Sequence, residues 1–529
     1  MAGAAAGLRR ALALLAVALV LVVAGGSRPV VAKTAVLSLR ELVEGRRGAA
    51  AKDRSTPYTD AKREMRGQHK KAGAARTATT VLELKHHSLT TIPDEPAARD
   101  RYLLRLLEAD EARANSLQLR YRAAASTLSG QSAAAAVAAA EVPLTSGLRF
   151  QTLNYVTTIS LGGSSGGGGG GANLTVIVDT GSDLTWVQCK PCSACYAQRD
   201  PLFDPAGSAT YAAVPCNASA CAASLKEATG TPGSCATSGG GGAGGGGGGG
   251  GDERCYYALA YGDGSFSRGV LATDTVGLGG ASLAGFVFGC GLNNRGLFGG
   301  AAGLMGLGRT ELSLVSQTAP RYGGAFSYCL PAAASASGSL SLGGDASSYR
   351  NTTAVAYTRM IADPAQPPFY FLNVTGAAVG GAALAAEGLG AGNVLIDSGT
   401  VITRLAPSVY RAVRAEFARQ FGAGDGAAGY RAAPGFSILD TCYDLAGHDE
   451  VKVPLLTLRL EGGAEVTVDA AGMLFVVRKD GSQVCLAMAS LAYEDQTPII
   501  GNYQQKNKRV VYDTAASRLG FADEDCGHV

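Results

Sequence analysis

Val176-Ile177-Val178-Asp179-Thr180-Gly181-Ser182 and Val394-Leu395-Ile396-Asp397-Ser398-Gly399-Thr400 follow the same pattern, 218 residues apart. In each stretch, an apolar run typical of a buried strand ends in an Asp and a Thr/Ser-Gly-Ser/Thr turn. Each is followed, after a long interval, by an apolar-apolar-Gly segment, Leu304-Met305-Gly306 in the first half and Ile499-Ile500-Gly501 in the second. The repetition predicts a duplicated lobe, with one copy at about residues 151–345 and the other at about 346–529.

The Asp in each stretch is expected at the end of a buried strand, where burial of a carboxylate is costly. A single Asp-Thr-Gly is most simply a turn capped by its own side chain. Two copies in matching context favour a second interpretation, in which Asp179 and Asp397 face a shared cleft. Two close carboxylates cannot both ionise easily, so the pair would share one proton.

Composition agrees with a two-lobed globular protein that is mostly β. The chain has 529 residues, of which 74 are Gly and 47% are hydrophobic, and this length favours two packing units. The hydrophobic content is that of a globular protein, which excludes a disordered chain. The Gly-rich tracts 162–171 and 239–251 predict loops, and they have no Gly-X-Y period, which excludes a collagen-like chain. Short apolar or alternating runs predict strands at 155–161, 174–178, 270–276 and 285–289, and the clearest helices are expected at 96–127 and 407–421.

The N-terminal region has the pattern of a secreted precursor. Arg9 and Arg10 precede an apolar run at 11–24 that is too short to span a membrane, which predicts a signal peptide at 1–26 and no membrane anchor. Residues 27–140 carry 20 Lys and Arg against 12 Asp and Glu, a net of +8, whereas residues 141–529 carry 24 against 31, a net of −7. A basic segment that binds an acidic body and leaves it in acid is expected of a propeptide, which we place at 27–140. The expected location is extracellular or vacuolar.

From residue 150 to its end, the chain resembles the pepsin-like aspartic proteases, and the paired Asp motifs carry the match. The resemblance implies an all-β, bilobal fold with the active site in the cleft between the lobes. It implies that Asp179 and Asp397 activate a water that attacks a peptide bond, with no acyl-enzyme. Protein or peptide substrates are therefore expected.

The residues around the two Asp match supporting positions of that family. Thr180 and Ser398 resemble the pair whose hydroxyls lock the two loops together, although Thr is more frequent at the second position. Ser182 and Thr400 resemble hydroxyls that hydrogen-bond the carboxylates. Two glycines fit turns with positive φ or with no room for a side chain, and these are Gly181 and Gly399.

A third element is Tyr261-Gly262-Asp263-Gly264-Ser265, whose Gly-Asp-Gly sequence predicts the turn of a β-hairpin. In the family, such a hairpin is the flap that closes over the substrate, and Tyr261 matches its tyrosine. Trp186, the one Trp of the chain, stands where the family has a Trp that hydrogen-bonds this Tyr. Packing in the core is the alternative role for Trp186.

All 12 Cys lie beyond residue 188, and the even number predicts a disulfide framework in an oxidising compartment. The spacing of Cys189, Cys192 and Cys195 could also suit a metal, but a secreted chain favours disulfides. Four further Cys bracket an insertion ahead of the flap and resemble the nepenthesin-type plant subfamily: Cys216, Cys221, Cys235 and Cys255.

Two disulfides are expected to use cysteines of the C-terminal half. The family resemblance implies a bond between Cys442 and Cys485. Nine Cys precede residue 346 and three follow it, so complete pairing requires at least one bridge between the halves. Cys329 with Cys526 is the candidate, because each follows a short apolar strand.

Other chemistries lack the residues they need. Beyond residue 140 the sequence has two His, His448 in a polar loop and His528 near the end, so a Ser-His or Cys-His apparatus has no suitable base. We expect no metal, no cofactor, no nucleic-acid partner and a monomer. Potential glycosylation sites are Asn173, Asn217, Asn351 and Asn373.

The competing hypothesis is a catalytically inactive inhibitor or binder on the same fold, like the plant inhibitors of cell-wall glycoside hydrolases. Such proteins typically lack an intact Asp pair. Here both Asp motifs and the flap Tyr are present, which favours the protease.

Overall fold

The computed structural model describes residues 33–44, 93, 95–124, 140–146, 152–163, 171–236, 254–261, 264–333, 335–343, 349, 352–390, 392–422 and 429–527. The expected signal peptide, the segment 45–92 and the tract 239–251 lie outside these residues. The described residues are mostly β-strand with few helices, and the all-β expectation is confirmed.

The largest sheet of the described chain has 15 strands. Their bounds are β2 (Ala140–Ser146), β3 (Tyr155–Leu161), β4 (Ala172–Asp179), β5 (Trp186–Gln188), β6 (Ala212–Ala213), β7 (Ser234–Ala236), β8 (Arg254–Ala260), β9 (Phe266–Leu278), β10 (Ala281–Arg295), β11 (Gly303–Gly306), β12 (Ala325–Cys329), β13 (Ser337–Leu342), β14 (Ala356–Arg359), β28 (Lys508–Asp513) and β29 (Arg518–Asp523). They lie in the order β14-β29-β28-β12-β13-β2-β3-β4-β11-β5-β10-β9-β8-β7, with β6 paired to β9.

Three smaller sheets hold the other strands of the described chain. An eight-stranded sheet contains β15 (Phe371–Val379), β16 (Ala382–Ala383), β17 (Asn393–Ile396), β18 (Thr403–Leu405), β22 (Leu456–Leu460), β23 (Glu465–Thr467), β26 (Met488–Ser490) and β27 (Ile499–Ile500). A four-stranded sheet contains β19 (Arg431–Ala433), β20 (Cys442–Asp444), β24 (Leu474–Val476) and β25 (Val484–Leu486), and a pair is formed by β1 (Thr34–Ser38) and β21 (Glu450–Pro454).

The two halves repeat the same strand arrangement around their Asp motifs. In the first half, β4 is parallel to β11, β11 is antiparallel to β5, and β5 is parallel to β10. In the second half, β17, β27, β18 and β26 follow the same parallel, antiparallel, parallel order. The apolar-apolar-Gly segments noted in the sequence are β11 and the stretch that begins with β27, so each lies beside its Asp-bearing strand.

Strands from distant parts of the chain join the two halves in the large sheet. β12 pairs with β28, and the rings of Phe326 and Tyr512 stack at 4.4 Å between centroids. A disulfide links Cys329, at the end of β12, to Cys526, beyond β29. The two halves therefore share one sheet and one covalent bond at the base of the molecule.

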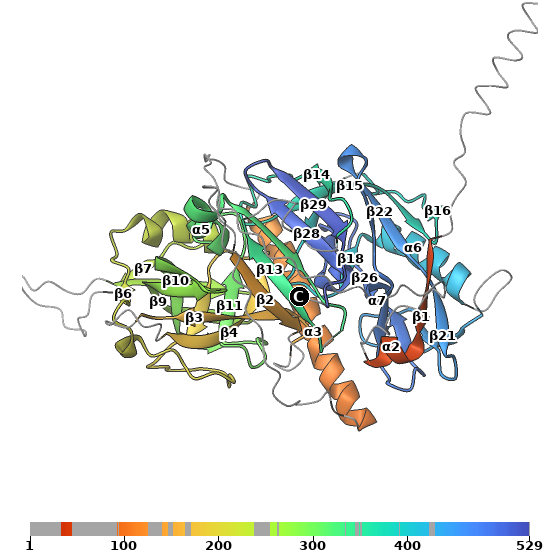
Figure 1. Cartoon of the computed structure of the whole chain (residues 1–529), viewed down its shortest axis with the longest axis horizontal. Coiled ribbons are helices and arrows are strands. Elements are labelled where there is room, and N and C mark those ends of the chain that lie inside the picture. The colour runs from red at the N-terminus through yellow and green to blue at the C-terminus, as the bar shows by residue number, and fades with distance from the viewer. Residues whose placement is uncertain are drawn as a thin grey trace, which may run out of the picture.

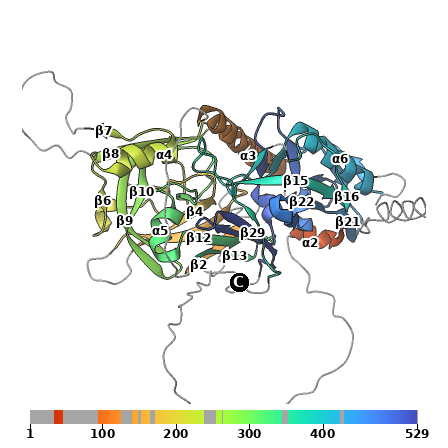
Figure 2. The same ribbon diagram turned by 90° about the horizontal axis from the view of Figure 1, so that it is seen from above.

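The helices of the described chain cover the sheets or lie between the lobes. They are α2 (Leu39–Glu44), α3 (Pro96–Ala124), α4 (Leu225–Thr229), α5 (Leu314–Tyr322), α6 (Pro407–Phe421) and α7 (Ala470–Met473). The 29 residues of α3, about 44 Å long, run between the two lobes in Figure 1 and across both in Figure 2. Leu103 and Leu107 of α3 are buried in a cluster with residues of the C-terminal half, including Ile402 and Leu439.

The segment 27–95, whose sequence shows little periodicity, also contains two regular elements. β1 adds an edge strand to β21, with Thr34 opposite Pro454 and Ser38 opposite Glu450, and α2 follows directly (Figure 1). This pairing depends on a partner strand more than 400 residues away in the chain, so local periodicity does not reveal it.

Replacement of both Cys329 and Cys526 by Ser should lower the free energy of unfolding by about 2–4 kcal/mol, because the bridge restricts a long stretch of the unfolded chain. The bonded residues are 197 apart in sequence. Equilibrium unfolding in urea measures the loss. The matched control replaces Cys192 and Cys195, which are bonded and only 3 residues apart, and should lose less. Equal losses in the two variants would contradict the role of the long-range bridge.

Candidate active site

The two motif carboxylates lie at the ends of equivalent strands. Asp179 is the last residue of β4, and Asp397 directly follows β17. Both side chains are fully buried, at 0% exposure. The apolar residues before each Asp are also buried, so the strands carry both carboxylates into the interior of the molecule.

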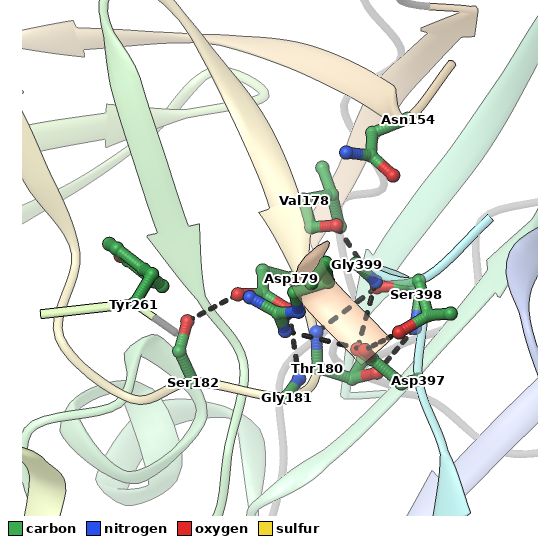
Figure 3. A network of polar contacts seen from close by, with 12 residues as sticks. Asn154, Val178, Asp179, Thr180, Gly181, Ser182, Tyr261, Asp397, Ser398 and Gly399 are labelled. Atoms are coloured by element: carbon green, nitrogen blue, oxygen red, sulfur yellow. Dashed lines mark hydrogen bonds and ion pairs between the residues drawn. The ribbon is translucent and has the colours of Figure 1, made fainter. Parts of the chain in front are cut away.

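Reciprocal hydrogen bonds connect the two loops behind the carboxylates (Figure 3). The Ser398 hydroxyl accepts from the Thr180 backbone N–H at 3.0 Å, and the Thr180 hydroxyl accepts from the Ser398 N–H at 2.9 Å. The Ser398 hydroxyl also donates to the Val178 carbonyl at 3.0 Å. The structure therefore brings together the two hydroxyls for which the sequence suggests a locking role.

Each carboxylate accepts the same pair of local hydrogen bonds. Asp179 accepts from the Ser182 hydroxyl at 2.6 Å and from the Gly181 N–H at 3.0 Å. Asp397 accepts from the Thr400 hydroxyl at 2.6 Å and from the Gly399 N–H at 2.8 Å. These bonds satisfy oxygens that burial would otherwise leave without partners.

Gly181 and Gly399 stand where the opposite carboxylate leaves no room for a side chain. A Cβ on Gly181 would lie 2.7 Å from Asp397 Oδ1, and a Cβ on Gly399 would lie 2.2 Å from Asp179 Oδ1. Both distances are far below van der Waals contact. Each loop can therefore approach the opposite carboxylate only because it carries no side chain at this position.

A guanidinium from helix α3 bridges the carboxylates. Arg113 Nη2 donates to Asp179 Oδ1 at 2.6 Å and to Asp397 Oδ2 at 3.3 Å. The Arg113 side chain is 13% exposed and both partners are at 0%. The sequence analysis did not single out this residue, which lies 66 positions before Asp179 among the many Lys and Arg of its segment.

The pKa values of the two carboxyls move apart. Burial raises the pKa of both, but at Asp179 the Arg113 charge and the hydrogen bonds from Ser182 and Gly181 outweigh it, so the pKa is lowered. At Asp397 burial and the charge of Asp179 prevail over Arg113, and the pKa is raised. Burial would lower the pKa of Arg113, yet the two carboxylates raise it, so the guanidinium stays charged.

Tyr261 lies over the same site at the end of the hairpin formed by β8 and β9. Its hydroxyl accepts a hydrogen bond from Trp186 Nε1 at 3.0 Å, and its ring packs edge-on to Phe298 at 5.6 Å. Trp186 is fully buried and also contacts Phe298 at 5.0 Å. Both suggested roles of Trp186, the hydrogen bond and core packing, are therefore present in one arrangement.

Other residues singled out in the sequence lie elsewhere. Gly264 has φ +79°, as a turn requires, whereas Gly262, Asp263 and His528 fall outside the described residues. Asn173 and Asn217 are exposed, Asn373 is half-buried with its amide 3.5 Å from Glu461, and Asn351 lies outside the described residues.

All twelve Cys are bonded in six disulfides. The pairs are Cys189–Cys290, Cys192–Cys195, Cys216–Cys235, Cys221–Cys255, Cys329–Cys526 and Cys442–Cys485. In the part of the chain that the structure describes, the one close group of metal-ligating side chains is Cys216, Cys221 and Cys235, whose sulfurs belong to two of these bonds. The cysteines therefore act as cross-links.

Two like lobes, each with a buried Asp aimed at the other, define the class of pepsin-like aspartic proteases. The relatives agree with this class. An aspartyl protease family protein of Arabidopsis thaliana is 39% identical over 460 residues, which cover 85% of this chain and 88% of the relative. The aspartic proteinase nepenthesin-1 of Nepenthes gracilis is 33% identical over 364 residues, 67% of this chain and 75% of the relative. The chain belongs to the nepenthesin-type plant aspartic proteases and is an aspartic-type endopeptidase.

Family models and solved structures match the same region. Models described as xylanase inhibitor N-terminal and xylanase inhibitor C-terminal match residues 155–344 and 369–523. The crystal structure of edgp has a TM-score of 0.55 at 21% identity, covering 74% of this chain and 95% of that one. Soybean basic 7S globulin has a TM-score of 0.54 at 18% identity, with 73% and 95% covered. These two structures share the fold with this chain.

Ser398→Ala should destabilise the protein by about 1–3 kcal/mol, because the Thr180 N–H and the Val178 carbonyl would lose a buried partner. Thermal unfolding followed by circular dichroism measures the change. Ser398→Thr is the matched control, because it keeps the hydroxyl and should stay close to the parent. A full loss in both variants would show that size, rather than the hydroxyl, matters at this position.

Proposed function

We propose that this chain is an aspartic endopeptidase made as a zymogen, which hydrolyses peptide bonds in acid by means of Asp179 and Asp397. One observation carries the proposal: a single nitrogen of Arg113, from the segment before the lobes, contacts both carboxylates. In this state the carboxylates have a positive partner and no room for a substrate carbonyl. Removal of the helix would leave two buried carboxyls that share a proton.

Because the two carboxyls share one proton, one Asp acts as the general base and the other as the general acid. A water between the carboxyls gives a proton to the ionised Asp while its oxygen attacks the peptide carbonyl carbon. The protonated Asp gives its proton to the carbonyl oxygen, so a tetrahedral diol forms. Collapse of the diol breaks the C–N bond, with a proton passing to the leaving nitrogen. Ser182 and Thr400 hold the carboxylates in place throughout, and Tyr261 closes the site from above.

The proposed propeptide, 27–140, contacts the body well beyond the dyad. Arg99 Nε donates to the Val477 carbonyl at 2.7 Å, and Asp100 pairs with Arg478 at 2.8 Å. β1 adds its strand to β21 at a separate place. These contacts support a helix held along the cleft between two lobes, which we propose at about 151–345 and 346–529.

Acid should release the helix, because the Arg113 contact requires ionised carboxylates. Burial raises the pKa of both Asp residues and Arg113 lowers it, so the helix-bound state binds fewer protons than the helix-free state. The contact is strongest at neutral pH. It weakens as the pH falls, first through the raised pKa of Asp397 and then through the lowered pKa of Asp179.

Secretion to the cell exterior or the vacuole is part of the same proposal, supported by the N-terminal pattern, the six disulfides and the sequons. None of the helices in the described residues has the length and hydropathy needed to cross a membrane. We propose a monomer that acts on proteins or peptides, with no nucleic-acid partner. The inactive inhibitor stays as the second candidate, because the matching family models carry the xylanase inhibitor name.

Asp179→Asn should abolish self-processing of the purified precursor in acid, because the dyad loses the carboxylate that takes the proton from water. The expected loss of activity on a denatured protein is at least about a thousandfold. Gel analysis of the acidified precursor, with and without pepstatin, measures both reactions. Cleavage by the variant that resists pepstatin would refute the dyad, and a folded, processed protein with no activity would support the inhibitor.

Arg113→Gln should raise the pH of half-maximal self-processing by about one unit or more, since a neutral amide no longer favours ionised carboxylates. The rate of propeptide loss measured across a pH series tests this shift. Arg105→Gln is the matched control, because Arg105 is exposed on the same helix. Identical pH profiles for the parent and the Arg113 variant would contradict the proposal that Arg113 inhibits the precursor by contacting the two carboxylates.

A further inference from the structure

A second buried cation of the cleft has its partner in the same helix. Arg404, on β18, is 3% exposed, and its Nη2 contacts Asp110 Oδ2 at 3.0 Å. Within the described residues, Asp110 is the one carboxylate in an ion pair with Arg404. Asp110 belongs to α3, which the proposed activation removes, whereas Arg404 stays in the body. A buried charge that loses its partner is costly unless another group takes its place.

Three donors converge on the Asp110 carboxylate. The Val401 backbone N–H donates to Oδ1 at 2.5 Å, the Ile402 N–H donates to Oδ2 at 3.1 Å, and the Arg404 guanidinium completes the set. Arg404 is itself oriented by a bond from Nη1 to the Ile402 carbonyl at 3.1 Å. Two backbone N–H groups and a fixed guanidinium form a carboxylate-binding site of a kind that a surface Arg does not provide.

Apolar residues surround this site. Leu107 lies about one turn and Leu103 about two turns before Asp110 in α3, and both pack into a cluster with Val401, Ile402 and Phe436. Removal of the helix would uncover an apolar pocket beside the three donors. A ligand that replaces the helix would therefore gain from an apolar side chain next to an acidic one.

A further contact of α3 resembles the pairing of an extended chain. The Gln118 side-chain amide donates to the Thr497 carbonyl at 2.7 Å and accepts from the Thr497 N–H at 2.9 Å. This pair of bonds is the one that a neighbouring β-strand would make with the backbone of one residue. The cleft thus offers free backbone groups to an extended peptide once the helix has left.

We propose that Arg404, with the N–H groups of Val401 and Ile402, forms a subsite that binds an Asp or Glu side chain of the substrate. The inference rests on the proposed protease function and names its substrate class: peptides with an acidic residue beside apolar ones. Asp110 lies three residues from Arg113, about 4.5 Å along the helix axis. An extended peptide covers that distance in one or two residues, so the acidic residue belongs within about three residues of the scissile bond.

The test uses enzyme obtained by processing the folded precursor, and peptide pairs that differ only by Asp or Asn. The substituted position is moved through three residues on each side of the scissile bond. At about pH 5, where a peptide Asp is mostly ionised, the Asp peptide should have about tenfold higher kcat/KM at one position. Arg404→Gln should bring this ratio to about one, whatever happens to the absolute rates.

Two further variants separate a specific role from a structural one. Arg404→Lys keeps the positive charge and should retain part of the preference, although it loses the guanidinium fork. Arg411→Gln is the matched control, because Arg411 is an exposed Arg of the same half of the chain, and its ratio should equal that of the parent. A role of Arg404 in stability alone would change both peptides equally and leave the ratio unaltered.

Binding of the same peptides to the Asp179→Asn variant, whose propeptide is removed by an added protease because the variant cannot process itself, makes the subsite testable without catalysis when it is measured by fluorescence anisotropy. If the Asp peptide binds preferentially but the parent protein cleaves neither peptide, the proposed subsite is supported and the proposed protease function is rejected. Cleavage and binding without any Asp preference would reject the subsite and keep the protease. Absence of both preference and cleavage would reject both.

Discussion

Two fully buried carboxylates lie face to face at the centre of this molecule, and the surrounding structure depends on how they are stabilised. Unpaired, they would carry a large desolvation cost and would repel each other. Local hydroxyls and backbone N–H groups satisfy part of each side chain, and glycines let the loops approach. Arg113 adds a positive charge, since its Nη2 contacts Asp179 Oδ1 and Asp397 Oδ2, one oxygen of each carboxylate. In the proposed zymogen, Arg113 compensates this buried charge before processing, and a shared proton compensates it afterwards.

Three side chains of helix α3 bind polar groups of the cleft. In the proposed enzyme, the backbone and side chains of a substrate would bind these groups instead. Arg113 neutralises the carboxylates, Asp110 occupies the donors around Arg404, and Gln118 pairs with Thr497 as a strand would. Leu103 and Leu107, which precede Asp110 in the helix, and Leu117, which precedes Gln118, pack into apolar clusters of the body. A helix cannot be cleaved easily in this position, because its peptide bonds are engaged in its own hydrogen bonds. This arrangement supports the proposal that the helix occupies the cleft reversibly and leaves it in acid.

Much of the architecture can be predicted from the sequence, because its signals are local. The motif around Asp179 and its copy around Asp397 indicate strand, turn and duplication within seven residues each, and the leucine pattern indicates the helix at 96–127. The role of Arg113 cannot be predicted in this way, since nothing near it distinguishes it from the other basic residues of its segment. β1 is missed for a related reason, because its partner β21 is far away in the chain. Net charges of opposite sign suggest attraction but do not locate the contact.

The most direct test measures binding of a labelled peptide of residues 95–124 to the processed enzyme across about pH 3 to 7, beside the same peptide with Arg113→Gln. Loss of the guanidinium should weaken binding strongly near neutral pH, where both carboxylates are ionised, and the two peptides should converge in acid as the carboxylates take up protons. Equal binding of the two peptides at every pH would contradict the claim that Arg113 inhibits the enzyme by neutralising Asp179 and Asp397.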